Sequence, residues 1–100
     1  MKPLIKIFSG TQELDLINDN VDVEVILDNG DRYSATFFTI SNIQFLLDQY
    51  KKTGECSYGL YFWASDMIIV ENISEDIIRD TVFDLLHSGE FYTSFSKLEC

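Results

Sequence analysis

In residues 21–38, VDVEVILDNGDRYSATFF, two runs of alternating apolar and polar side chains flank the turn sequence DNG. Such alternation is typical of strands that have one apolar face and one face in water, and the turn joins the two strands into an antiparallel hairpin. Every other predicted element is placed relative to this hairpin. Its apolar positions are Val21, Val23, Val25, Leu27, Tyr33, Ala35 and Phe37.

The length of the turn follows from which side chains would meet across the hairpin. A two-residue loop at Asn29 and Gly30 would place Val25 opposite Ser34, which mixes apolar and polar faces. A three-residue loop, with Gly30 in the left-handed conformation, places Val25 opposite Tyr33 instead. Because a one-residue slip turns a whole set of apolar side chains outward, the sequence favours the three-residue loop.

A first helix is predicted over residues 42–53. Ser41 is the expected N-cap, and Gln44 completes a capping box with it. Gly54 follows as a left-handed C-cap, and the apolar stripe of the helix is expected to be buried. The stripe consists of Ile43, Leu46, Leu47 and Tyr50.

A second helix is predicted over residues 75–88. Ser74 is its expected N-cap and Gly89 ends it. An apolar stripe again marks the side that should face the core. This stripe consists of Ile77, Ile78, Val82, Leu85 and Leu86.

Three aspartates of the second helix, Asp76, Asp80 and Asp84, recur every four residues and therefore share one helix face. We refer to these three residues as the acidic ridge. A solvated helix face is one interpretation of this pattern. The other is a surface that binds a basic partner, which makes the acidic ridge a candidate partner-binding site.

Residues 58–71, YGLYFWASDMIIVE, are rich in aromatic side chains. We expect strands at 59–64 and 67–71, joined as a second hairpin, with Tyr61 and Trp63 on one face. Tyrosine and tryptophan often anchor protein interfaces, so both are candidate partner-binding residues. Because two helices would not easily cover both faces of the sheet, we expect one of the two to stay partly exposed in the monomer, with burial of both in the core as the alternative. The opposite face, assigned to the helix-backed core, carries Leu60, Phe62 and Ala64.

With a further strand at 4–8, the elements follow the order β-β-β-α-β-β-α. The expected fold is α+β, an antiparallel sheet of about five strands with two helices, in a single domain over residues 1–100. Residues 10–20 fit either a strand or a loop. The tail from Gly89 onward fits either a helical turn or an extended segment.

Charge gives the strongest compositional signal, because the chain has 17 acidic and only 7 basic residues and the net charge is −10. Such a field repels nucleic acid and anionic lipid and favours basic protein partners. No apolar run is long enough to span a membrane, and the first residues do not form a signal peptide, so a cytoplasmic location is expected. In that compartment Cys56 and Cys100 are expected to remain thiols.

No motif for catalysis is present in the sequence. His87 is the single histidine and lies at a predicted helix end, where a structural role is expected. Phosphate-binding loops, dinucleotide fingerprints and serine hydrolase motifs are absent, and the calcium-loop-like NDNVDV has valine where glycine is required. We therefore expect no enzyme, no catalytic or metal-binding residues and no cofactor.

The acidic composition, the DNGDRYSATFF hairpin and the helix-capped GLYFWASDMIIVE segment together resemble the small immunity proteins of bacterial polymorphic toxin systems, including those of contact-dependent growth inhibition. The resemblance covers the whole length. It implies tight binding to a basic toxin domain, often a nuclease, that blocks the active site or the substrate surface. The alternatives are a homodimer that hides the Trp63 face and a small enzyme that uses carboxylates.

Overall fold

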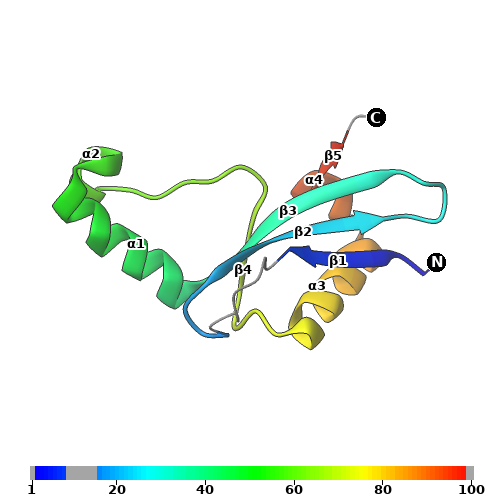
Figure 1. The fold of residues 1–100 in the computed structure, drawn as a ribbon. Coiled ribbons are helices and arrows are strands. Elements are labelled where there is room, and N and C mark those ends of the chain that lie inside the picture. Colours follow the sequence, from blue (N-terminus) through cyan, green and yellow to red (C-terminus); the bar gives the residue numbers. More distant parts are fainter. Residues whose placement is uncertain (1, 9–15, 99–100) are drawn as a thin grey trace.

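The computed structural model describes residues 2–8 and 16–98 (Figure 1). The elements follow the order β-β-β-α-α-β-α-α-β. The predicted α+β class and the five-stranded sheet are confirmed, with two long helices and two short ones. The open question of a strand within residues 10–20 falls mostly on residues 9–15, which lie outside the described part of the chain.

The sheet is organised around β3 (Arg32–Thr39), which has strands on both of its edges. On one edge it pairs antiparallel with β2 (Asn20–Ile26), and β2 pairs antiparallel with β1 (Leu4–Phe8). On its other edge it pairs parallel with β4 (Met67–Val70) and antiparallel with β5 (Ser96–Leu98). The two short strands therefore follow one another along the same edge of β3.

The predicted register of the first hairpin is confirmed. Val23 lies opposite Ala35, and Val25 lies opposite Tyr33. Gly30 has φ +89°, the left-handed conformation that a three-residue loop requires. All four of these paired residues are buried, so the apolar side of the hairpin forms the base of the core.

Helix α3 (Glu75–Ser88) covers the apolar face of the sheet, and its predicted bounds are confirmed. The Ser74 side chain caps its first turn by accepting a hydrogen bond from the backbone N–H of Ile77. Ile78 and Val82 are fully buried against the strands because they stand on the stripe that faces the sheet. The chain then turns at left-handed Gly89, as predicted.

The tail adopts both of the expected conformations in succession. A single helical turn, α4 (Phe91–Ser94), is followed by β5 at the edge of β3. Phe91 packs edge-to-face on Tyr33 with ring centroids 5.1 Å apart, and Phe95 packs on Phe37 at 6.1 Å. These contacts close the core at the end of the sheet where β5 pairs.

Helix α1 (Ile40–Thr53) begins differently from the prediction. Its N-cap is Thr39, whose Oγ1 accepts a hydrogen bond from the backbone N–H of Asn42, so the assignment of Ser41 and the Gln44 capping box is wrong. The physical reason is that β3 continues into the helix without a loop, and its last residue provides the cap. The predicted C-cap is confirmed by left-handed Gly54.

The second predicted hairpin is wrong. Residues 59–64 form no strand, and β4 pairs parallel with β3 instead of antiparallel with them. The chain instead makes a short turn, α2 (Glu55–Gly59), in which Cys56, Ser57 and Tyr58 are all left-handed. This turn sends the chain back along α1 before β4 begins.

Because residues 59–64 are not a strand, their predicted division into a core face and an opposite face is also wrong. Leu60, expected in the core, is 81% exposed. Phe62 is half-buried, and its ring lies between Phe38, at a centroid distance of 5.2 Å, and Tyr50, at 6.3 Å. Phe62 therefore fastens the returning chain to β3 and α1 instead of filling the core under a helix.

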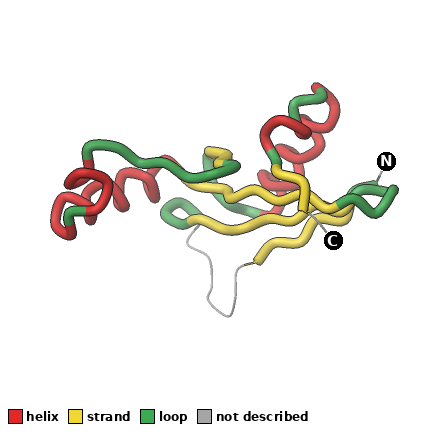
Figure 2. The backbone as a smooth tube through the Cα atoms, turned by 90° about the horizontal axis from the view of Figure 1, so that it is seen from above, coloured by secondary structure: helices red, strands yellow, loops and turns green. Residues whose placement is uncertain are grey.

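Residues 40–66, which comprise α1, α2 and the returning segment, form what we call the arm. Figures 1 and 2 show the arm projecting from one end of the sheet, and the molecule measures 45 × 25 × 25 Å. The apolar stripe of α1, which consists of Ile43, Leu46, Leu47 and Tyr50, is only half-buried. The expectation that both long helices flank the sheet is therefore wrong for α1, because α1 packs mainly on α2.

Replacing Thr39 tests this start of α1. Thr39→Ala removes the side-chain oxygen that caps α1. Because Thr39 is buried, the change is expected to lower the free energy of unfolding by about 1–2 kcal/mol. Ser41→Ala, at the exposed position that the sequence favoured, is the matched control and is expected to change it by less than about 0.5 kcal/mol. Urea unfolding measures both. A larger loss for Ser41→Ala would contradict the observed cap.

Candidate interaction surfaces

The acidic ridge lies on the solvent side of α3, and Asp76, Asp80 and Asp84 are all exposed. Arg79 contacts the start of the ridge, with its Nη1 atom 3.7 Å from Oδ1 of Asp76 and its Nη2 atom 3.0 Å from Oε1 of Glu75. Within residues 2–8 and 16–98, no ion pair is formed by Asp80 or Asp84. Two carboxylates of the ridge thus remain available to an external cation.

Tyr61 and Trp63 lie on the segment of the arm that returns to the sheet. Their exposed fractions are 49% and 66%, so the expectation that at least one of them stays exposed in the monomer is confirmed. They do not point from a strand, because this segment is not part of the sheet. Their role in partner binding stays a prediction.

The two sets of predicted site residues belong to different parts of the molecule. The ridge stands on α3, which covers the sheet, whereas the two aromatic residues stand on the arm. Among the described residues, no hydrogen bond, ion pair or ring contact joins one set to the other. The structure therefore presents two surfaces with different chemistry instead of a single composite site.

A buried polar cluster fixes the base of the arm. The Asn42 side chain, at the start of α1, accepts a hydrogen bond from Nδ2 of Asn20 at 2.8 Å and donates one to Oδ1 of Asn18 at 3.2 Å. Oγ1 of the capping residue Thr39 also accepts a hydrogen bond from the backbone N–H of Asp19 at 3.4 Å. Since Thr39 and Asn42 are buried, breaking these bonds would leave unpaired polar groups, and the direction of the arm is held firmly.

The inner side of the arm is held by aromatic packing. Tyr50 stacks on Phe62 with an interplanar angle of 15°. Burial raises the pKa of the Tyr50 phenol, and the nearby Cys56 and Glu55 raise it further. Tyr50 therefore stays neutral at physiological pH and acts here as a packing residue.

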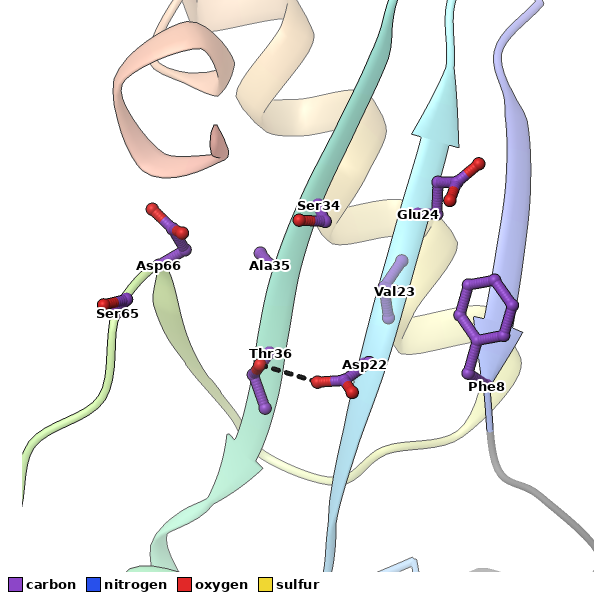
Figure 3. A pocket seen from close by; sticks show the side chains of 9 residues that line it. All are labelled: Phe8, Asp22, Val23, Glu24, Ser34, Ala35, Thr36, Ser65 and Asp66. Carbon is purple, nitrogen blue, oxygen red and sulfur yellow. Dashed lines mark hydrogen bonds between the residues drawn. The ribbon is translucent and has the colours of Figure 1, made fainter. Parts of the chain in front are cut away.

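A depression of about 350 Å³ lies on the face of the sheet opposite α3 (Figure 3). Asp22, Glu24, Ser34 and Thr36 line it from the alternating positions of β2 and β3 that point away from the core. Thr36 donates a hydrogen bond to Oδ1 of Asp22 at 2.8 Å across these strands. The lining residues are Phe8, Asp22, Val23, Glu24, Ser34, Ala35, Thr36, Ser65 and Asp66.

Sequence reasoning missed this depression. The alternation of VDVEV already placed Asp22 and Glu24 on one wet face, which was the available signal. Asp66 and Ser65 reach the site from the end of the arm, where the backbone C=O of Asp66 accepts from the N–H of Thr36 at 3.0 Å. Their position could not be predicted because the second hairpin was assigned wrongly.

Glu24 and Arg32 form an ion pair on this face. Two hydrogen bonds of 3.1 Å join the Arg32 guanidinium to the two carboxylate oxygens of Glu24. The hydrogen bond from Arg32 lowers the pKa of Glu24; burial opposes this shift, and the charges of Arg32 and Lys6 add to it. A proton-donating catalyst would need a raised carboxyl pKa, and Glu24 has the opposite shift.

Residues 2–8 and 16–98 contain no cluster of three or more side chains of the kinds that ligate metals. Over the same ranges, no helix combines the length and the apolar character that crossing a membrane requires. Cys56 is a half-buried free thiol. Cys100 lies outside the described residues.

Comparison with known proteins gives no match to a family model, to a curated protein or to a solved structure.

The ion pair between Glu24 and Arg32 predicts a specific pH dependence. Because the folded-state pKa of Glu24 lies below its ordinary value of 4.5, the pair contributes stability above that pH and loses it as the pH falls through the lower value. Glu24→Gln should therefore be less stable than the wild type at pH 7, and the difference should shrink toward pH 3.

Urea unfolding at several pH values measures this difference. Asp80→Asn removes the same charge from an exposed position that forms no ion pair with any described residue, and it serves as the control. Its stability relative to the wild type should be unchanged or slightly higher at pH 7, because a like-charge neighbour is removed. A deficit of Glu24→Gln that stays constant from pH 7 to pH 3 would contradict the role of the carboxylate charge.

Proposed function

We propose that this protein neutralises a basic protein toxin by binding it stoichiometrically, as immunity proteins of bacterial polymorphic toxin systems do. The observation that carries the proposal is the acidic ridge, whose Asp80 and Asp84 carry no ion pair among the described residues. Carboxylates four residues apart on a helix repel one another and destabilise it by roughly 0.2–0.5 kcal/mol per pair. Helix stability therefore does not explain this spacing of aspartates, whereas binding to a basic surface does.

The distribution of charge over the chain supports the same partner class. The arm contains three acidic and two basic side chains, so nine of the ten net negative charges lie in the rest of the chain. This concentration creates a negative field that accelerates association with a positive surface and fixes its orientation. A toxin that acts on nucleic acid carries such a positive surface, and covering it would block access of the substrate.

Capture from the native cell tests the proposal directly. The tagged full chain should retain a basic protein at one-to-one stoichiometry, which mass spectrometry identifies. The purified partner should be toxic or nucleolytic when alone and inactive when this protein is added. A retained partner with an acidic surface, or one whose activity persists in the complex, would overturn the proposal.

Neutralising the ridge tests which surface makes the contact. Asp80→Asn with Asp84→Asn should weaken binding of the captured partner by about tenfold, or about 1.4 kcal/mol, and should reduce its salt dependence. The matched control removes two charges from the arm, Asp48→Asn with Glu55→Gln, and should change the affinity little. Calorimetric titration over a range of NaCl concentrations compares them. Equal losses in both variants would show that net charge alone, and not the ridge, determines the affinity.

A further inference from the structure

The arm exposes a set of large apolar side chains that the sheet and its helices leave uncovered. The exposed fractions are 70% for Tyr58, 81% for Leu60 and 66% for Trp63, and Tyr61 follows at 49%. All four belong to one stretch of six residues that runs from α2 toward the sheet. Monomeric proteins seldom expose so many large apolar side chains together unless another surface covers them.

The arm holds these side chains in a defined position. Its base is tied to the sheet by the buried bonds of Thr39 and Asn42, and its inner side by the ring of Phe62 between Phe38 and Tyr50. An interface that is already ordered before association loses little conformational entropy on binding. The backbone that carries the exposed side chains is therefore held in place before any contact forms.

Charge identifies the partner that fits this surface. Residues 40–65 contain two acidic residues, Asp48 and Glu55, and two basic ones, Lys51 and Lys52, so this part of the arm is neutral. A basic partner would gain no electrostatic attraction there. A second copy of the chain, in contrast, would meet no repulsion there, although the rest of the chain carries nearly all of the net charge.

The acidic ridge stands on a different part of the molecule from these apolar residues. The arm projects from one end of the sheet, whereas the ridge belongs to α3, which covers the sheet (Figures 1 and 2). Two copies that meet through their arms therefore do not have to bring their acidic ridges into contact. Since repulsion between exposed charges is screened beyond roughly 8 Å at physiological salt, the net charge of −10 does not prevent this association.

The area is in the range that a stable contact needs. Each aromatic side chain can bury roughly 150–250 Å², so Tyr58, Leu60, Tyr61 and Trp63 expose on the order of 500 Å² together. A standard interface buries about 800 Å² per partner, of which the apolar centre is one part and a polar rim the rest. Exposed polar side chains of the arm, such as Asp48, Lys51 and Lys52, can supply that rim.

We propose that the arm is the surface through which two copies of this chain form a symmetric homodimer, with Leu60 and Trp63 at its apolar centre. The two-fold axis places the same residues of both copies in contact. This inference does not rest on the proposed toxin partner, because it uses a different surface and a different kind of interaction. The acidic ridges stay accessible in the dimer.

The mass of the full chain in solution is the first test. Sedimentation velocity from about 1 µM to about 200 µM should show conversion from a monomer of 11.6 kDa to a particle of twice that mass. Leu60→Ser should raise the dissociation constant by about tenfold or more, because Leu60 makes little contact within its own chain. Leu4→Ser, at an exposed leucine of β1, is the matched control and should leave the dissociation constant unchanged.

Trp63 provides a second readout, because it is the single tryptophan of the sequence. Its emission should shift to the red and become quenchable by iodide as the wild type is diluted, and in Leu60→Ser the same shift should already occur at about tenfold higher concentration. Because the contact is apolar, dimerisation should persist in about 1 M NaCl, where ridge-mediated binding is weakened. Asp80→Asn with Asp84→Asn should dimerise like the wild type even where it fails to bind a partner.

Several results would overturn the inference. A wild type that remains a monomer at the highest concentration would exclude the dimer. A dimer that Leu60→Ser leaves intact, or that Leu4→Ser disrupts equally, would place the contact elsewhere. A blue shift of Trp63 that occurs in a verified monomer only on addition of the basic partner would assign the arm to that partner.

Discussion

Across the β2–β3 hairpin, Val23 lies opposite Ala35 and Val25 lies opposite Tyr33, and this apolar register determines the rest of the molecule. A slip of one residue would move the buried side chains of β3 to the uncovered face, and with them the surface on which α3 packs. The other edge of β3 holds both β4 and β5, so their pairing depends on the same register. Because β3 also runs directly into α1, it sets the point at which the arm leaves the sheet.

The parts of the fold that the sequence predicted correctly are those in which local and tertiary preferences agree. In the hairpin, alternation, turn chemistry and burial all favour one register, and in α3 the cap at Ser74, the apolar stripe and Gly89 coincide. Residues 59–64 fail because their strand propensity depends on neighbours that the sheet does not provide. The residue types of Cys56, Ser57 and Tyr58 do not predict three successive left-handed residues, since this conformation costs a non-glycine residue roughly 1–2 kcal/mol.

The candidate site was predictable to the extent that it lies within one element. The spacing of the acidic ridge is a property of a single helix, and its exposure follows from the opposite stripe of Ile78 and Val82. The exposure of Tyr61 or Trp63 was expected because two helices would not easily cover both faces of a sheet, although the observed reason is that residues 59–64 are not part of the sheet. The depression involves Asp66, whose place depends on the parallel pairing of β4, and no local pattern indicates that pairing.

The separation of charge from apolar surface has a consequence for how many copies can associate. An exposed set such as Leu60, Tyr61 and Trp63 on a neutral protein would favour open-ended aggregation. Here nine of the ten net negative charges lie outside the arm, so a contact made by the arm adds little repulsion of its own. Every further copy brings its own net charge of −10, so each addition increases the repulsion within an assembly. The same acidity that would attract a basic partner would therefore oppose open-ended self-association through the arm.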